Sequence, residues 1–303
     1  MAVVAAISVL AGTLVVASPA PLKTVFLHNT FIDKYKDRAL ITDDTFLVDF
    51  VPPSPHDRGA DGDIHGSGRP AMEIGLPTVV EIVNARLVKP AMADLQNHLG
   101  GKVLPVVGAW RLWLEHPSSI PQRQGETVHV DPAKKSNPAH VFEIHPLTKV
   151  GTQTILADSW RNIDGFTPYP ADVAFPYYEG DAAGLVVNRG PVFTTVSGQT
   201  AQYNYAGFEA QLLGSAHALN DDGFWFLARV LGKDGKSVVQ KPRRMIFING
   251  TEAATAAKPN LRLRLLGIPR FDLNRLAKES TAQPGKDLKL LGAYEMIIVG
   301  LIK

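Results

Sequence analysis

The chain has 303 residues, 45% of them hydrophobic and 20% charged, and it contains no cysteine. This composition is typical of a globular protein and excludes collagen, coiled coils and extended disorder, while the length suits one large β domain or two medium ones. The lack of cysteine excludes disulfides, thiolate metal ligands and cysteine nucleophiles. A net charge of +2 is too small to identify a nucleic-acid-binding protein by overall charge.

Residues 2–17 are almost wholly apolar, and the first basic residue of the chain is Lys23. A secretory signal normally has Lys or Arg before its apolar run, and this run is shorter than a membrane span. Its β-branched residues favour a buried strand pair. We therefore expect a retained N-terminal strand and a cytoplasmic protein without a membrane span, with export through this segment as the alternative.

Short runs of β-branched and aromatic residues, bounded by Gly, Pro, Asn and Asp, predict strands along most of the chain. The expected strands are 24–27, 39–50, 79–83, 103–114, 141–144, 184–187, 192–196, 202–213, 224–231, 245–248, 261–266 and 294–302. Helical patterns are few, at residues 91–99, 251–258 and 273–280. Long polar loops are expected at 52–59, 117–138 and 164–176, and the stretch 158–176 is interpreted as a linker between two halves.

The two halves resemble each other. In each, a strand leads through a short helix to a long strand with a central glycine and then to a closing strand, and residues 106–111 (VVGAWR) align with 265–270 (LLGIPR). An OB-type barrel ends in this order, and the glycine lets its long strand bend at the barrel corner. We therefore predict a mainly β protein of two OB-like barrels, residues 1–157 and 177–303, with two β sandwiches as the alternative.

Short motifs in the first half also indicate this fold. Residues 107–110 (VGAW), followed by 142–146 (FEIHP), resemble the closing strands of OB-like domains in uncharacterised bacterial proteins. In those domains an Asp-Gly-Asp-x-His segment lies upstream, which here is residues 61–65. The resemblance covers about residues 25–150 and implies a fold but no established chemistry.

The segment Asp61-Gly62-Asp63-Ile64-His65 is a candidate metal site. In an extended chain Asp61, Asp63 and His65 share one face, while Ile64 faces the core. Two carboxylates and an imidazole on one ridge can hold a divalent cation. The alternative is a polar turn that enters a strand, since Asp-Gly is common in hairpins.

Glu143 and His145 are the candidate catalytic residues. In a strand, Phe142 and Ile144 face inward while Glu143 and His145 face outward together. A carboxylate beside an imidazole can act as an oriented general base or supply two metal ligands, and a structural hydrogen-bonded pair is the alternative. The second and fifth strands of an OB barrel are not neighbours, so this pair and residues 61–65 would meet only at a bend or at the barrel mouth.

Charge is distributed unevenly along the chain. Residues 241–303 hold twelve Lys and Arg against five Asp and Glu, whereas the first 240 residues hold nineteen against twenty-four. A basic groove with aromatic side chains is how OB folds hold single strands. The candidate phosphate contacts and stacking residues are Arg243, Arg244, Arg262 and Arg264, with Tyr203, Tyr205 and Trp225.

Three functions follow as hypotheses. The first is ligand binding, with single-stranded nucleic acid or an oligosaccharide as the partner, because OB surfaces bind both. The second is a metal-dependent hydrolase, acting on phosphodiesters, in which residues 61–65 hold the cation and Glu143 or His145 is the base. It requires Asp63 and His145 to lie close together. The third is a structural protein that forms homo-oligomers through apolar strand edges at 2–16 and 296–302.

Overall fold

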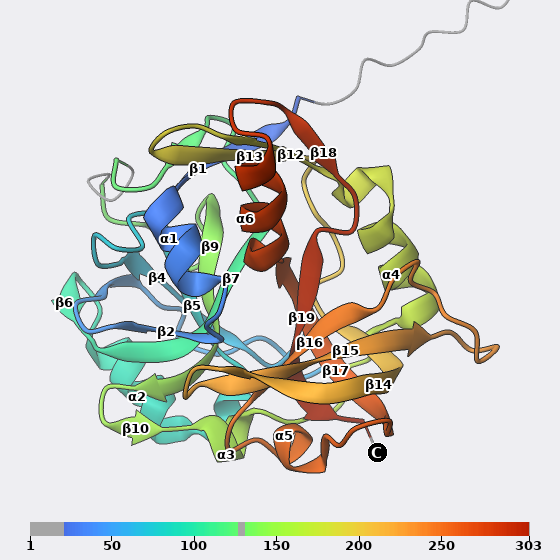
Figure 1. The fold of residues 1–303 in the computed structure, drawn as a ribbon. Coiled ribbons are helices and arrows are strands. Elements are labelled where there is room, and N and C mark those ends of the chain that lie inside the picture. The colour runs from blue at the N-terminus through green and yellow to red at the C-terminus, as the bar shows by residue number, and fades with distance from the viewer. Residues whose placement is uncertain (1–20, 127–130, 303) are drawn as a thin grey trace, which may run out of the picture.

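The computed structural model describes residues 21–126 and 131–302, and its secondary structure is mainly β (Figure 1). The strands are β1 Lys23–His28, β2 Leu40–Asp43, β3 Leu47–Phe50, β4 Ile64–Arg69, β5 Thr78–Ile82, β6 Lys102–Val103, β7 Val106–His116, β8 Gln122–Arg123, β9 His140–Val150, β10 Gln153–Thr154, β11 Tyr169–Pro170, β12 Leu185–Arg189, β13 Phe193–Gly198, β14 Ala206–Leu219, β15 Gly223–Leu231, β16 Arg243–Ile248, β17 Arg262–Phe271, β18 Leu288–Leu290 and β19 Tyr294–Leu301. The helices are α1 Asn29–Tyr35, α2 Lys89–Asn97, α3 Leu156–Ser159, α4 Ala171–Glu179, α5 Glu252–Ala256 and α6 Leu273–Ala282. The strand pair expected at residues 2–17 lies outside the described residues.

The second half of the chain closes into a barrel. β14 pairs with both β15 and β17, so the ring runs β14-β15-β16-β19-β17 and returns to β14. β16 and β19 are parallel, and α5 lies between β16 and β17 in the chain. This is the strand and helix order of an OB-type barrel, so the predicted OB-like fold is confirmed for this half.

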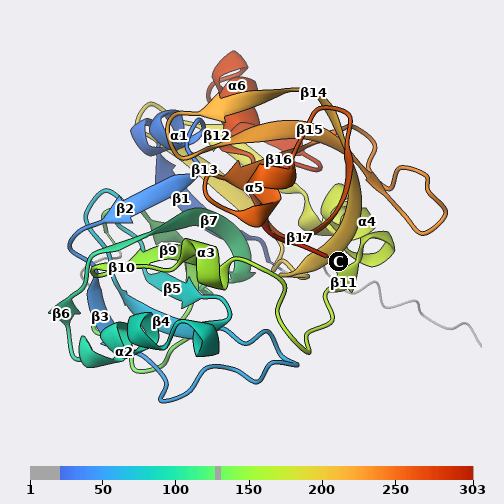
Figure 2. The same cartoon turned by 90° about the horizontal axis from the view of Figure 1, so that it is seen from below.

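The first half has the same order in a curled sheet, β2-β7-β9-β5-β4-β3, with α2 between β5 and β7 in the chain (Figure 2). This sheet, the first barrel of the chain, is a half-barrel that no pairing among the described strands closes. The strand predicted at 39–50 is interrupted and forms both β2 and β3. β2 pairs with β7 at one edge and β3 pairs with β4 near the other, where the two-residue β6 is the last strand, so one stretch of chain runs between the two ends of the sheet. The interruption is a turn, in which the Asp43 carboxylate accepts hydrogen bonds from the backbone N–H of Thr45 and Ala71.

A third sheet, β18-β12-β13-β1-β8, combines strands of both halves, since β1 pairs with β13 (Figure 1). The segment interpreted as a linker, residues 158–176, contains most of α4, a helix that was not predicted and has Pro176 inside it. Phe175 and Tyr178 of this helix are fully buried. Their burial stabilises a helix that proline alone would disfavour.

The C-terminal strand β19 is not a sheet edge. It pairs with β16 on one side and with β17 on the other. Barrel closure thus removes one of the two edges on which the hypothesis of assembly through strands depends, and the other edge lies outside the described residues. In the described part of the chain, none of the helices has both the length and the apolar character that crossing a membrane requires.

Candidate metal centre

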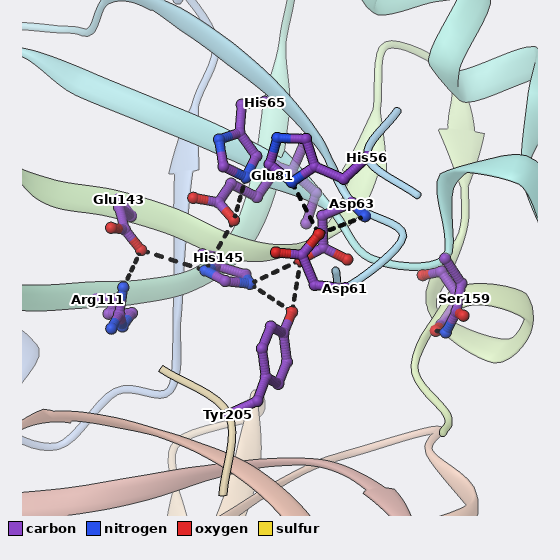
Figure 3. Close-up of polar contacts among 12 residues, drawn as sticks. His56, Asp61, Asp63, His65, Glu81, Arg111, Glu143, His145, Ser159 and Tyr205 are labelled. Carbon is purple, nitrogen blue, oxygen red and sulfur yellow. Dashed lines mark hydrogen bonds and ion pairs between the residues drawn. The ribbon is translucent and has the colours of Figure 1, made fainter. Parts of the chain in front are cut away.

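Three neighbouring strands of the first barrel bring the candidate residues together. β5 lies between β4 and β9, and Glu81 of β5 faces His65 of β4 across the sheet. Glu81 Oε2 is 3.2 Å from His65 Nε2 and 3.2 Å from His145 Nδ1 (Figure 3). The second and fifth strands of this barrel are not adjacent, but a carboxylate on the third strand connects their side chains. Glu81 was not among the residues predicted from the sequence, although it is the one charged residue of the apolar strand β5.

Asp63 and His145 lie close together and are both fully buried. Their Oδ2 and Nε2 atoms are 3.5 Å apart. Tyr205, which directly precedes β14 in the second half, donates its hydroxyl proton to Asp63 Oδ2 at 2.6 Å (Figure 3). Tyr205 Oη is also 2.8 Å from His145 Nε2, which therefore donates to it. Among the described residues Asp63 Oδ1 has no hydrogen-bond partner, so this buried oxygen is available to a ligand.

Glu143 contacts the His145 imidazole from the buried side of the cluster. Its Oε2 atom is 3.2 Å from His145 Nδ1 and accepts a hydrogen bond from Arg111, whose side chain is fully buried. Its Oε1 atom is 3.1 Å from His140 Nε2. Carboxylates in this position orient metal-ligating imidazoles. Glu143 and His145 are together, as expected, but both are enclosed by protein, which suits a ligand and its positioning carboxylate better than a base that meets a substrate.

His56, Asp61 and His65 form the open side of the cluster. His56 Nδ1 is 2.8 Å from Asp61 Oδ1, and the His56 ring meets the His65 ring edge-on at 4.5 Å between centroids. His56 is exposed, Asp61 is half-buried and His65 is 8% exposed. His56 was not a candidate, although it lies in a predicted long loop only five residues before Asp61.

The ligand atoms therefore fall into two groups, one of Asp63, Glu81 and His145 and one of His56, Asp61 and His65. Within each group the potential ligand atoms all lie within 4.8 Å of one another. Imidazole nitrogens with carboxylate oxygens suit zinc, manganese, iron or cobalt. The three residues expected to hold one cation are thus divided, because Asp63 joins the buried group while Asp61 and His65 join the open one.

The electrostatics of the cluster favour a cation. Burial by itself lowers the pKa of His145, but the charge of Glu81 and the bonds to Asp63 and Glu143 outweigh it and raise this pKa to about 10. Burial is likewise outweighed at His65, where the charge of Glu81 raises the pKa to about 9. Burial raises the pKa of Asp63 to about 6. At neutral pH His65 and His145 are therefore both protonated and together carry two positive charges. One divalent cation carries the same charge.

The second barrel has no such cluster at the matching positions. Arg111 faces Glu143 across β7 and β9, and Arg270 faces Glu295 across β17 and β19, so the two registers can be superposed. In this superposition, His65, Glu81 and His145 correspond to Trp225, Ile246 and Ile297. Ile246 and Ile297 are fully buried in an apolar cluster. The barrel fold therefore does not require ionisable groups at these positions, and burying them is costly unless they serve another purpose.

The arginines predicted to contact phosphates have different surroundings. Arg243 is buried and makes two hydrogen bonds to the Glu179 carboxylate, at 2.7 and 2.5 Å. Arg244 is also buried, and its Nη1 atom lies 3.1 Å from Glu295 Oε2. Arg262 and Arg264 are exposed on β17. Two of the four arginines are thus used inside the protein, where a phosphate would have to replace a buried carboxylate.

The aromatic candidates are also separated from one another. Tyr205 is part of the cluster around Asp63, whereas Tyr203 packs edge-on against Tyr169 at 4.8 Å between ring centroids. The Trp225 ring stacks with His217 of β14 at 4.1 Å and contacts the Arg244 guanidinium of β16 at 4.7 Å. These contacts occupy the ring that a base would need for stacking.

Comparison of the chain with protein-family models, with curated proteins and with solved structures finds no match. The site is therefore interpreted from its own geometry.

Proposed function

We propose that this protein is a hydrolase that depends on a divalent metal. Asp63, Glu81 and His145 would anchor the cation from the buried side of the cluster. The observation that carries the proposal is the 3.5 Å approach of Asp63 to His145, with Glu81 in contact with both His145 and His65. The hydrolase hypothesis requires this convergence, and neither a binding surface nor an assembly role does.

The cluster is closed on one side and open on the other. Tyr205, Glu143 and Arg111 seal the buried side, while His56 and Asp61 reach solvent. Structural zinc sites are filled by protein ligands, whereas catalytic sites keep positions for water and substrate. The asymmetry therefore favours catalysis over a purely structural metal.

A cavity that none of the proposed ligands lines is connected to the cluster through residues 163–166 and offers room for a substrate. It measures about 630 Å³ and is lined by residues that include Ile163, Asp164 and Phe166. Ile163 and Asp164 also line a hollow beside Gly62, the residue between Asp61 and Asp63, and Phe166 packs against the Tyr205 ring at 5.5 Å between centroids. Clefts of this size hold small molecules or one end of a longer one.

In the proposed reaction the cation activates substrate and water, and the residues of the chain position the ligands. A bound divalent cation polarises the substrate and lowers the pKa of a water molecule. Glu143 keeps the His145 ring in position, and Tyr205 orients Asp63 by donating to one of its oxygens. Asp63, Glu81 and His145 are buried, whereas the side chains of His56 and Asp61 are 41% and 18% exposed, so substrate and water would enter on that side.

The proposal is tested by metal removal and reconstitution. The full chain is stripped with a chelator and reloaded with Mn²⁺, Co²⁺ or Zn²⁺. Its metal content is measured, and its turnover of bis(4-nitrophenyl) phosphate, 4-nitrophenyl phosphate and 4-nitrophenyl acetate is compared. We expect turnover of at least one ester that chelation abolishes and metal restores.

Two variants make this test specific to the cluster. Asp63→Asn should lower metal-dependent turnover by about 100-fold or more, because it removes a ligand charge while keeping the side chain's size. His217→Gln removes an exposed imidazole of the second barrel and should change nothing. A chain that binds none of the three metals, or turnover that survives Asp63→Asn, would overturn the proposal.

A further inference from the structure

We infer that the centre holds two divalent cations, the second between His56, Asp61 and His65 at its open side, and that the pair acts on phosphate esters. This inference rests on the proposed function and extends it to a second metal site and to a class of substrate.

The open group has the composition and spacing of a metal site. It has two imidazoles and one carboxylate, whose potential ligand atoms all lie within 4.8 Å of one another. The contact between His56 Nδ1 and Asp61 Oδ1 is 2.8 Å, and the His56 and His65 rings meet at 4.5 Å. Because its members come from a loop and from the start of β4, they converge only in the folded chain.

The backbone around this group is already held in place. The His56 N–H donates to the carbonyl of Asp63 at 2.8 Å, and Arg86 donates to the carbonyl of His56 at 2.6 Å. The Asp63 N–H donates to Asp61 Oδ1 at 3.2 Å. These bonds fix the loop without a metal, so a cation would meet ligands that need little further ordering.

Glu81 is positioned to join the two sites. Its Oε2 atom is 3.2 Å from His65 of the open group and 3.2 Å from His145 of the buried group. In two-metal hydrolases the cations lie about 3.5–4 Å apart, so they need a ligand group between them. Within the described part of the chain Asp63 Oδ1 is buried without a hydrogen-bond partner, which independently indicates that the inner part of the centre binds a ligand.

The charges at the opening point to an anionic substrate. Arg58 and Arg86 line the small hollow beside Gly62, next to Asp61. Arg58 lies 3.8 Å from Asp164, and Arg86 lies 3.7 Å from Asp57. The Arg58 pair is long and solvent-exposed, so it contributes little and Arg58 can exchange Asp164 for a phosphate group, whereas Arg86 also donates to the carbonyl of His56.

The reaction that fits this arrangement is phosphate-ester hydrolysis. The oxygen of a water molecule attacks phosphorus, and the bond from phosphorus to the ester oxygen breaks. One proton of the water passes to the leaving oxygen, so an alcohol and a phosphate with one ester bond fewer are formed without any redox change. Two cations stabilise the attacking and the leaving oxygen of such an in-line displacement.

Manganese loading of the full chain tests the second site. We expect the wild-type protein to bind two Mn²⁺ and to give an exchange-coupled electron paramagnetic resonance spectrum. The double variant H56Q/D61N should bind one Mn²⁺, give the six-line spectrum of an isolated ion and lose about 100-fold or more in turnover of bis(4-nitrophenyl) phosphate. The matched control H217Q/D221N changes an exposed imidazole and an exposed carboxylate of the second barrel and should keep both ions.

The outcomes separate this inference from the proposed function. A wild-type protein with one uncoupled Mn²⁺ that still hydrolyses an ester would overturn the second site and leave the hydrolase intact. A protein that binds no metal would overturn both. For the substrate class, two esters with the same leaving group are compared, and Arg58→Gln should raise KM for bis(4-nitrophenyl) phosphate but not for 4-nitrophenyl acetate. An unchanged KM for bis(4-nitrophenyl) phosphate in Arg58→Gln, or an equal rise in KM for both esters, would overturn the phosphate assignment.

Discussion

Arg111 and Arg270 hold the two barrels together by a reciprocal contact. Arg111 Nε donates to the carbonyl of Pro269, the residue before Arg270, at 3.0 Å. Arg270 Nη1 donates to the carbonyl of Trp110, the residue before Arg111, also at 3.0 Å. Each arginine also pairs with a glutamate on the closing strand of its own barrel, Glu143 or Glu295. Arg111 thus links the barrel interface to the carboxylate that supports His145.

The pair in the second barrel should be essential for stability. Arg270 and Glu295 are each 1% exposed and 2.7 Å apart. Arg270→Met leaves the Glu295 charge buried with only Arg244 beside it, so we expect a loss of about 3–5 kcal/mol in the free energy of unfolding. Urea denaturation measures it. Arg262→Ala, which breaks the exposed pair with Glu209, should cost at most about 1 kcal/mol, and equal losses in the two variants would contradict this expectation.

Glu143 should act on metal affinity through His145. Glu143→Gln keeps the shape of the side chain but removes the charge that orients and polarises the imidazole. We expect metal affinity, measured by competition with a chelator, to fall by about 10–100-fold while the number of ions bound at saturation stays the same. Glu279→Gln, on the exposed side of α6, is the control. Unchanged affinity in Glu143→Gln would show that His145 does not depend on this carboxylate.

The Tyr205 hydroxyl should stabilise the first barrel from the second. Tyr205→Phe removes the bond to Asp63 at 2.6 Å and the contact with His145 at 2.8 Å. Two buried groups lose a partner, so the metal-free protein should lose about 1–3 kcal/mol of stability. Tyr203→Phe, at a half-buried ring nearby in the chain, should change stability by no more than about 0.5 kcal/mol. A matching loss in both variants would contradict the role assigned to Tyr205.

The metal-free protein should lose stability as the pH rises above neutrality. The pKa values of His65 and His145 are raised to about 9 and about 10. The stabilisation that this provides is complete below the unfolded value of about 6.5 and disappears as pH passes through the folded values. The groups that face His145 are Asp63, Glu81, Glu143 and Tyr205.

Denaturation of the metal-free chain at about pH 7 and about pH 10 measures this change. His145→Gln removes one of the two raised groups, so its stability should fall less between these pH values than that of the wild-type protein. The same decline in both proteins would mean that the imidazolium of His145 does not contribute.

The sequence alone determined the order of the elements in the second barrel and the strand-helix-strand-strand order that ends the first, whereas β4 was not predicted. Gly108 and Gly267 mark matching bends, and at Gly108 a Cβ atom would lie 2.6 Å from the carbonyl oxygen of Pro146, so a larger residue does not fit. The alternation correctly put Phe142 and Ile144 in the apolar core, but Glu143 and His145 on the other face of β9 are buried as well. Such features depend on residues close together in the chain, and local patterns therefore predict them.

The tertiary structure decided which charges meet. Alternation gives the face on which Asp63 and His145 lie but not the strand between them, and the sheet order inserts β5 with Glu81 there. Tyr205 reaches the same cluster from the other half of the chain. Arg243 and Arg244 belong to a basic sequence stretch but are neutralised by Glu179 and Glu295. Electrostatic interactions depend on distance in space, so a pattern along one chain predicts the carriers of charge but not their partners.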